Sequence, residues 1–385
     1  MRIFIIAALI LFSFSCKKTS GDPGIGDTYN FPEGLPAQLQ KGINLSNWFN
    51  DYSDPAQFAT RFTAAHFATL KSLGFTYVRL PIGNTILFQP ANPSQLNTAN
   101  IGYIDNAVKM ITDAGLAVIL DHHPWQDDYE KQLYYNPSKI TELQSYWTAL
   151  ATHFTTYTPQ QIFFEVYNEP HYAQIAGDAD GWKWWWPLQE KLVQSIRAAA
   201  GKYYIIAGGE GWNSIQYLTA CTPYDTKGVV YNFHFYEPFV FTHQGATWVG
   251  DPWPLLHDVP YPSTPENVAP LIAATTNTDV QNLLSWYGNY RYNADTLDKL
   301  IKVAADWATA HNVPLMCNEF GVYKTYALPA DRAACIHDVR SILEKYKIGW
   351  AMWECDEGFG LLTYPGPDRN NFTTDTGIAH ALGLE

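Results

Sequence analysis

Two glutamates, each at the end of an apolar run, could form a catalytic pair of carboxylates. Glu169 lies in the segment IFFEVYNEP, and Glu319 lies in the segment PLMCNEFG. Glycoside hydrolysis needs such a pair, because one carboxylic acid protonates the leaving oxygen while a second carboxylate attacks the sugar or activates water. Their surroundings must separate the two pKa values. We expect the glutamate with apolar neighbours to keep its proton, and the one beside Arg79 and the Tyr236 hydroxyl to stay ionised.

Further polar residues lie at or just after the ends of other apolar runs, as the two glutamates do. They are Arg79, Asp121, His122, His123, Asn168, His234, Tyr236 and Trp353. In a barrel of parallel strands, residues at the C-terminal strand ends gather in one ring and form the site. His122 and His123 are adjacent, and strand neighbours point to opposite faces, so only one of them faces the site. A metal-ligand role for these histidines is the weaker alternative, and we predict no metal site.

Two other glutamates also lie near the ends of apolar runs. We interpret Glu165 as a packing residue or a partner in a surface salt bridge. Glu210 is equally consistent with a place in the cleft and a place outside it. For Glu169 and Glu319, the structural alternative is a buried ion pair with a core arginine, which their position on two strand ends disfavours.

Eight short runs rich in β-branched and aromatic residues alternate with longer segments of helical period. The predicted strands are residues 42–45, 77–80, 117–121, 162–166, 204–207, 229–233, 314–318 and 349–352. The predicted helices are residues 64–73, 101–114, 140–156, 184–200, 213–218, 297–311, 330–345 and 376–382. Parallel strands need crossover helices, so the pattern predicts a single-domain α/β fold, a (β/α)8 or TIM barrel. A doubly wound sheet is the competing fold, but no Gly-x-Gly-x-x-Gly follows the first strand.

One connection is longer than a barrel of this size requires. Residues 237–295 are rich in Pro, Asn and aromatic residues, and they lie between the sixth predicted strand and its helix. A loop that follows a strand lies on the catalytic face of such a barrel. We therefore expect an enlarged loop after strand 6 at the site.

The composition favours a neutral ligand. Lys and Arg number 24 against 37 Asp and Glu, which gives a net charge of −13, and aromatic residues make up 15% of the 385 residues. Without a basic patch, nucleic acid is excluded as a main partner, and so are polyanionic polysaccharides. Cys221, Cys317, Cys335 and Cys355 are widely spaced, so they predict free thiols rather than a zinc site.

The N-terminus has the features of an export signal. Arg2 and the apolar run after it predict a signal peptide over residues 1–15. Cys16 follows a small residue, as in a bacterial lipoprotein, and residues 16–36 then form a lipid-anchor cysteine and a flexible linker. The folded domain covers residues 37–385. An ordinary signal peptide cut near Ser15 is the alternative, and we expect a periplasmic protein or, with Cys16 acylated, a cell-surface lipoprotein.

Six motifs together resemble those of glycoside hydrolase family 5, the cellulase-like endoglycanases, over nearly all of residues 42–353. They are YVRLP at 77–81, VILDHH at 118–123, YNEP at 167–170, HFY at 234–236, NEFG at 318–321 and WAMW at 350–353. The resemblance implies retaining hydrolysis, with Glu169 as general acid/base and Glu319 as nucleophile. The acidic stretch at 354–357 departs from the amide-rich sequence that the resemblance implies.

The resemblance also implies supporting roles. Arg79 and Tyr236 would hold Glu319, and His234 would lie beside Glu169. Asn168 would reach the sugar 2-hydroxyl, His123 would be the family's third-strand histidine and Trp353 the floor of the cleaving subsite. Among the other tryptophans, we expect Trp48 and Trp253, and after them Trp185, to stack on sugar rings.

We therefore expect cleavage of internal β-1,4 bonds in a neutral polysaccharide, with β-glucan as the first substrate class. A β-mannan, a xyloglucan and an exo-acting β-glucosidase specificity stay open. The rival classes are a glycan-binding lipoprotein without catalysis and a metal-dependent barrel hydrolase. We predict that the protein is a monomer, needs no cofactor and contacts a membrane only through the Cys16 anchor.

Overall fold

A computed structural model describes residues 29–384 except 90, 125–126, 173–176 and 178–181. The predicted signal peptide, Cys16 and the linker up to residue 28 lie outside the described residues.

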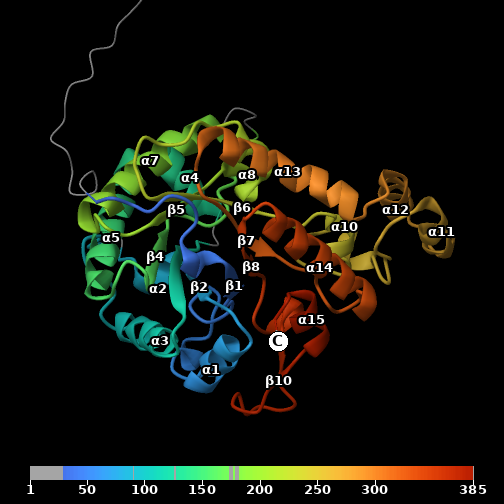
Figure 1. Cartoon of the computed structure of the whole chain (residues 1–385), viewed down its shortest axis with the longest axis horizontal. Helices are drawn as coiled ribbons and strands as arrows, with labels where there is room; N and C mark the ends of the chain where they lie inside the picture. The colour runs from blue at the N-terminus through green and yellow to red at the C-terminus, as the bar shows by residue number, and fades with distance from the viewer. Residues whose placement is uncertain (1–28, 90, 125–126, 173–176, 178–181, 385) are drawn as a thin grey trace, which may run out of the picture.

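Eight parallel strands close into a barrel in chain order, and helices surround it (Figure 1). The strands are β1 (Lys41–Asn44), β2 (Tyr77–Ile82), β3 (Ala117–His122), β4 (Ile162–Glu165), β5 (Ile205–Gly208), β6 (Val229–His234), β7 (Leu315–Phe320) and β8 (Gly349–Met352). β1 pairs with both β2 and β8, which completes the closure. The predicted TIM barrel is confirmed, because each of the eight apolar runs forms one barrel strand.

The surrounding helices include every predicted one. They are α1 (Ala64–Ser72), α2 (Asn84–Leu87), α3 (Ile101–Asp113), α4 (Asp127–Tyr135), α5 (Pro137–His153), α7 (Trp182–Ala199), α8 (Glu210–Asn213), α9 (Ile215–Thr219), α10 (Phe239–Thr242), α11 (Pro265–Ala274), α12 (Thr278–Tyr290), α13 (Ala294–His311), α14 (Pro329–Lys345) and α15 (Thr376–Ala381). Helix α5 begins three residues earlier than predicted. There Pro137 takes the first helical position and the Asn136 side chain accepts a hydrogen bond from the Ser138 backbone N–H.

The interior of the barrel has an apolar layer below a polar one. The apolar layer includes Tyr77, Ile119, Phe163, Val230 and Met316, which are all buried in one cluster. Two positions further along the same five strands lie Arg79, Asp121, Glu165, Asn232 and Asn318. Since side chains alternate along a strand, each polar residue faces the same interior as the apolar residue two positions before it. The strand periodicity therefore places the polar layer at the C-terminal end of the barrel.

The chain before β1 closes the opposite, N-terminal end of the barrel. Phe31 packs edge-on against Tyr204, at 5.0 Å between ring centroids, and lies 4.6 Å from the Arg197 guanidinium. Phe31 and Leu35 pack against the apolar layer. Gly228 is required here, because a Cβ on it would lie 2.4 Å from the Phe31 ring. The N-terminal segment thus joins the barrel at the face that is remote from the polar layer.

The enlarged loop after β6 contains helices of its own. Between Glu237 and Asp295 lie α10, α11 and α12, and the pair α11 and α12 projects away from the barrel (Figure 1). A hydrogen bond from the Tyr287 hydroxyl to the Pro260 carbonyl joins two parts of the loop, and one from the Tyr261 hydroxyl to Asp338 joins the loop to α14. The sequence predicted the insertion but not its helices.

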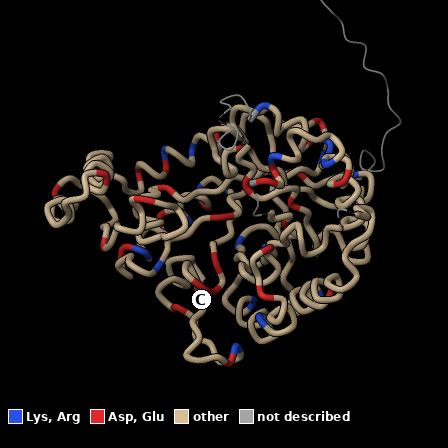
Figure 2. The backbone as a smooth tube through the Cα atoms, turned by 180° about the vertical axis from the view of Figure 1, so that it is seen from behind, with Lys and Arg blue, Asp and Glu red and all other residues tan. Residues whose placement is uncertain are grey.

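Across the described residues, no helix combines the length and apolar character needed to cross a bilayer. The four cysteines of the folded domain are free thiols, and three of them are buried. Lys and Arg are scattered along the chain among the more numerous Asp and Glu (Figure 2).

Candidate active site

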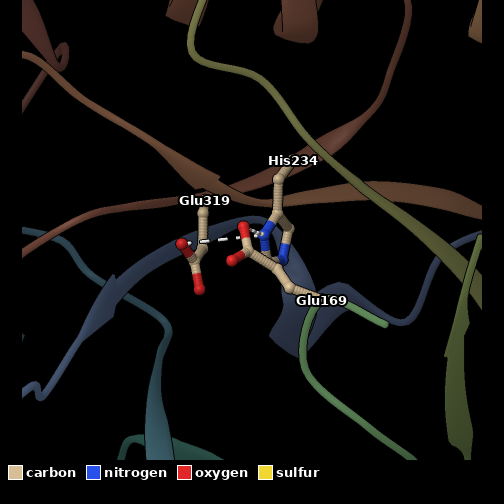
Figure 3. A group of neighbouring side chains, drawn as sticks. All are labelled: Glu169, His234 and Glu319. Carbon is tan, nitrogen blue, oxygen red and sulfur yellow. Dashed lines mark hydrogen bonds and ion pairs between the residues drawn. The ribbon is translucent and has the colours of Figure 1, made fainter. Parts of the chain in front are cut away.

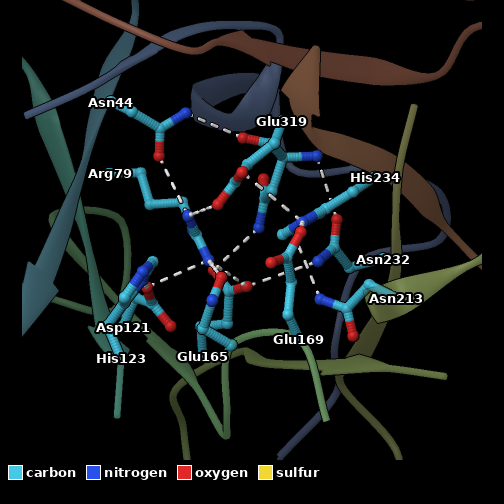
Figure 4. A network of polar contacts seen from close by, with 12 residues as sticks. Asn44, Arg79, Asp121, His123, Glu165, Glu169, Asn213, Asn232, His234 and Glu319 are labelled. Carbon is cyan, nitrogen blue, oxygen red and sulfur yellow. Dashed lines mark hydrogen bonds and ion pairs between the residues drawn. The ribbon is translucent and has the colours of Figure 1, made fainter. Parts of the chain in front are cut away.

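Arg79 lies at the centre of a buried network at the C-terminal end of the barrel (Figure 4). It donates to Glu319 at 2.6 Å, and to both oxygens of Glu165 at 2.7 and 3.0 Å. A third carboxylate, Asp121, lies 2.9 Å from Nη2. Arg79 also donates to Oδ1 of Asn168 at 2.8 Å. One guanidinium therefore faces three carboxylates in an interior that excludes water.

Burial raises the pKa values of these carboxyl groups. Burial raises the pKa of Asp121 to about 7, against an opposing effect of Arg79. Burial also raises the pKa of Glu165 and of Glu319 above the ordinary glutamate value, again with Arg79 opposing. The three carboxylates in turn raise the pKa of Arg79 well above its usual value despite its burial. Arg79 therefore stays charged at every pH at which the protein is folded.

A β-bulge aims Glu319 into the site. Along β6 and β7, Phe233 is opposite Cys317, but His234 is opposite Glu319, so β7 has one extra residue at this point. The bulge lets the adjacent Asn318 and Glu319 both contact interior groups, which regular alternation forbids. Glu319 then accepts hydrogen bonds from Arg79 and, at 2.9 Å, from the Tyr236 hydroxyl. Two donors, one of them a cation, stabilise its ionised form.

Glu169 has different surroundings. It follows β4 with a left-handed backbone, φ 46°, and its side chain is 24% exposed. Its Oε1 lies 2.7 Å from Nδ1 of His234, which is a neutral ring, since burial lowers the pKa of His234 to about 4. Desolvation raises the pKa of Glu169, against opposing effects of His123, Arg79 and His171. Glu169 therefore reaches solvent, and its direct partner is a neutral ring, whereas a guanidinium and a hydroxyl hold Glu319.

The two glutamates face each other across a short gap (Figure 3). One oxygen of Glu169, one oxygen of Glu319 and one ring nitrogen of His234 all lie within 4.8 Å of one another. This set of atoms would also suit a cation. Each of them, however, already contacts a protein group: Glu169 contacts His234, and Glu319 contacts Arg79 and Tyr236.

The polar ring includes His123 but not His122. His123 Nδ1 lies 2.7 Å from Oδ2 of Asp121, and its ring is stacked on Trp353 at 6.0 Å between centroids. His122 points to the outer side of β3, where its ring lies among Tyr129, Tyr146, Trp147 and Tyr167. Of the two candidate substrate-binding histidines, His123 is therefore the one that faces the site, and His122 is not a substrate contact, because the two-residue alternation of β3 places it in the outer core.

The predicted sugar contacts of two tryptophans are also wrong. Trp48 is 1% exposed, stacks on Phe49 at 4.6 Å, and donates its indole N–H to the Phe58 carbonyl. Trp185 is 1% exposed and donates to the Gly208 carbonyl. Both are core residues, because a loop or helix tryptophan packs inward wherever its neighbours leave an apolar space. Trp253 is half-buried and packs edge-on against Phe239, so its sugar contact stays a prediction.

The acidic stretch after Trp353 is less charged than its sequence suggests. Glu354 is 4% exposed and accepts hydrogen bonds from the Ser46 hydroxyl and the Phe359 backbone N–H. Burial raises the pKa of Glu354 to about 8. At neutral pH it is therefore an uncharged carboxylic acid, which resembles an amide in polarity and hydrogen bonding. Asp356, two residues on, is paired with Arg61 and Arg369.

The sequence reasoning missed several members of the network. Glu165 is not the packing residue or surface ion-pair partner that the strand pattern predicts, because it is 1% exposed and bidentate to Arg79. Asn44 accepts from Arg79, while Asn232 and Asn318 donate to Glu165. A signal was present, because Glu165 follows Phe163 by two positions in an apolar strand, and an inward charge at that position needs a buried partner. Glu210 is buried, near Glu130.

The arrangement defines a class of enzyme. Two carboxylates lie at the C-terminal end of a (β/α)8 barrel, one held by a guanidinium and a tyrosine hydroxyl and the other partly exposed beside a neutral imidazole. This arrangement meets the requirements of acid-assisted displacement at a glycosidic carbon. The fold and site are those of a glycoside hydrolase.

Residues 31–358 match the family model described as cellulase, glycosyl hydrolase family 5. The chain therefore belongs to glycoside hydrolase family 5. Endoglucanase 3 of Fibrobacter succinogenes is 25% identical over 90% of this chain, which spans 53% of that protein's length. Endoglucanase C of Acetivibrio thermocellus is 29% identical over 82% of this chain and 90% of its own.

A similar solved structure is Cel5A of Thermotoga maritima in complex with cellobiose. It has a TM-score of 0.71 and 23% identity, covering 90% of this chain and 97% of that one. At this identity the likeness concerns the fold.

Proposed function

We propose that the protein is a retaining endo-β-1,4-glucanase, with Glu319 as nucleophile and Glu169 as general acid/base. The observation that carries the proposal is the spacing of the two carboxylates, whose nearest oxygens lie within 4.8 Å of each other. Retaining glycosidases hold their carboxyl groups about 5 to 5.5 Å apart, and inverting enzymes about 6.5 to 9.5 Å apart, to leave room for water. The gap here suits direct attack on the sugar.

In the first step, the Glu319 carboxylate attacks the anomeric carbon while Glu169 gives its proton to the leaving glycosidic oxygen. The bond to the leaving sugar breaks, and a glycosyl ester of Glu319 forms. In the second step, Glu169 takes a proton from water as that water attacks the same carbon and frees Glu319. Arg79 and Tyr236 orient Glu319 and balance its charge. Asn168, held by Arg79, presents its amide N–H groups to the sugar.

We propose a neutral β-glucan as the substrate class. Trp353, stacked beside His123 and partly exposed, offers an apolar face to a pyranose ring. The endoglucanase names of the relatives from Fibrobacter and Acetivibrio support a glucan. β-Mannan, xyloglucan and exo-acting hydrolysis are the alternatives.

The test is a panel of soluble polysaccharides with sizing of the products. We expect mixed-linkage β-glucan or carboxymethylcellulose to be cut into a range of oligosaccharides, with a rapid fall in viscosity. Release of glucose alone would contradict endo action, and preferential cleavage of mannan or xyloglucan would contradict the substrate assignment. Proton NMR of the first product should show the β-anomer, whereas a first α-anomer would contradict retention.

Variants of Glu319 test the nucleophile. Glu319→Gln should abolish turnover while cello-oligosaccharides still bind, because the substitution removes the attacking charge and keeps the shape. With azide added, Glu319→Ala should form a glycosyl azide of inverted configuration. Sugar binding without turnover in the wild type would instead indicate a glycan-binding lipoprotein. Loss of wild-type activity with EDTA would indicate a metal-dependent hydrolase, while full activity supports metal-free catalysis.

We also propose that the chain is exported as a monomer and carries a lipid on Cys16, at the periplasmic membrane or the cell surface. The docking of Phe31 at the N-terminal end of the barrel supports an anchor that joins the enzyme on the face remote from Glu169 and Glu319. Residues 17–28 reach at most about 40 Å. Wild type should fractionate with membranes and Cys16→Ser should be soluble. Equal partition of the two would contradict the anchor.

A further inference from the structure

A strained turn after β5 aims a buried amide at the imidazole beside Glu169. Gly211, Trp212 and Asn213 have consecutive left-handed backbones, with φ of 65°, 55° and 53°. For a residue other than glycine, this conformation costs about 1–2 kcal/mol, and such strain is retained where function requires it. The Trp212 N–H donates to the Pro170 carbonyl at 3.1 Å, so the turn is attached to the segment that carries Glu169.

The turn places Asn213 against His234 (Figure 4). Nδ2 of Asn213 lies 3.3 Å from Nε2 of His234, and Asn213 is fully buried. Gly208 at the end of β5 makes room for it, because a Cβ there would lie 2.3 Å from Oδ1 of Asn213. The left-handed backbone of the turn and the absence of a side chain at Gly208 therefore both allow the contact between Asn213 and His234.

The contact determines which ring nitrogen carries the proton. The amide nitrogen of Asn213 faces the ring, and an amide nitrogen donates a hydrogen bond and cannot accept one, so this contact needs a bare Nε2 on His234. The ring is neutral, because burial lowers its pKa to about 4. Its single proton is therefore on Nδ1, which lies 2.7 Å from Oε1 of Glu169 and donates to it.

We propose that Asn213 is a positioning residue that fixes the tautomer of His234 and thereby confines the transferable proton of Glu169 to Oε2. Because Oε1 accepts from the imidazole whether Glu169 is protonated or not, Oε2 gives its proton to the leaving oxygen and later takes one from water. With the opposite tautomer, the bare Nδ1 would accept the carboxyl proton from Oε1 and hold it away from the substrate. The inference rests on the proposed acid/base role of Glu169.

Other charged and titratable groups face this pair and stay the same when Asn213 is changed. Arg79 from β2, Glu165 from β4, Glu319 from β7 and His123 after β3 act on His234. Arg79 and His123 also act on Glu169, together with His171, whose ring stacks on Trp212 at 5.1 Å. A change in the pH profile of an Asn213 variant therefore reports on the contact between Asn213 and His234.

Two substitutions test the proposal. Asn213→Gly removes the amide and suits the left-handed backbone. Asn213→Asp keeps the size but replaces the donor with an acceptor, which draws a proton to Nε2 and favours a doubly protonated ring. That charged ring would stabilise the Glu169 carboxylate. We therefore expect the alkaline limb of kcat/KM for cellotetraose to move to lower pH in Asn213→Asp.

The dependence on the leaving group separates this role from a structural one. Dinitrophenol departs without a proton, so kcat/KM for dinitrophenyl β-cellobioside, which reports only the first step, should stay near the wild-type value in both variants. Cellotetraose needs the acid, and its kcat/KM should fall about 10- to 100-fold. An equal loss on both substrates, or an unchanged ratio and pH profile, would overturn the proposal. If wild type cleaves neither substrate, the proposed function itself fails.

A measurement on the wild-type protein keeps the test independent of folding. In nitrogen-15 NMR, the His234 signals can be assigned by their loss in His234→Gln. We expect the chemical shift of a bare Nε2 and a protonated Nδ1 at neutral pH. A protonated Nε2 would overturn the proposal even if neither Asn213 variant folds.

Discussion

Nη1 of Arg79 lies 2.6 Å from Oε1 of Glu319, with both side chains almost fully withdrawn from solvent. The guanidinium is the only cation that the described contacts place against this carboxylate, apart from a histidine that burial keeps neutral. A charged hydrogen bond in such surroundings is stronger than one at the surface. It therefore distinguishes Glu319 from Glu169, whose direct partner is the neutral ring of His234.

Arg79→Lys should impair both catalysis and stability. A lysine keeps one charge but cannot reach Glu319, Glu165 and Asn168 together, so buried acceptors lose their donors. We expect unfolding free energy to fall by about 3–5 kcal/mol. Since Arg79 lowers the pKa of Glu319, the acidic limb of kcat/KM should move to higher pH. Urea denaturation and a pH profile measure these effects.

The matched control is Arg340→Lys on α14, where Arg340 pairs with Glu344 on the same helix. It should change stability by less than about 1 kcal/mol and leave the pH profile unchanged. A wild-type profile in Arg79→Lys would contradict the role of Arg79 in ionising Glu319.

Glu165→Gln should destabilise the fold although it removes a charge from an acidic cluster. Both oxygens of Glu165 accept hydrogen bonds, from Arg79, Asn232 and Asn318. An amide group turns one acceptor into a donor and leaves a buried donor unpaired, at a cost of about 1–3 kcal/mol. Thermal denaturation measures the loss. Glu142→Gln, in a partly exposed pair with Lys139, is the control and should be nearly neutral.

Trp48→Ala should unfold the protein more readily rather than selectively weaken sugar binding. The side chain is 1% exposed and packs on Phe49 and Phe62. Truncating a buried tryptophan costs about 3–5 kcal/mol. The control is Trp248→Ala, because Trp248 is 53% exposed and should lose little stability. If the Trp48→Ala protein kept the wild-type melting temperature but bound oligosaccharides more weakly, Trp48 would have to be a sugar contact rather than a core residue.

The buried carboxyl of Glu354 should make stability fall as the pH rises. Its pKa is about 8 in the folded protein, above the ordinary glutamate value of 4.5, so the folded state binds the proton more tightly than the unfolded state. The stabilisation is complete below about pH 4.5 and is lost as the pH rises to 8. In Glu354→Gln the melting temperature should fall less between pH 6 and 9 than in wild type. Parallel curves would contradict the neutral state of Glu354.

The strand-end pattern was sufficient to predict much of the site. Apolar runs followed by polar residues identify strand ends in a barrel. The residues that this pattern placed correctly at or near the polar ring are Arg79, His123, Asn168, Glu169, His234, Tyr236 and Glu319. Glu165 was missed although the same two-residue period places it inside. A charged residue in a strand is expected to face solvent unless it has a buried partner of opposite charge. The partner of Glu165 is Arg79, which lies on another strand, so the local sequence does not reveal it.

The tryptophans show where local sequence stops being informative. Trp48 and Trp185 lie next to site-forming loops in the sequence, but both are buried. Whether an aromatic side chain on a loop faces solvent or core depends on the space left by neighbours far along the chain. The hydrophobic period of the local sequence therefore cannot predict which way such a side chain points.

Hydrophobic period and turn residues are local properties, so the eight strands, their barrel and the residue types at the strand ends could be predicted from the chain alone. How those residues meet depends on the closed tertiary structure. It turned His123 inward and His122 outward, brought Glu319 into the site through a bulge against β6, and set Asn213 against His234 through a left-handed turn. These features depend on register and packing between distant segments, which are settled only when the barrel closes.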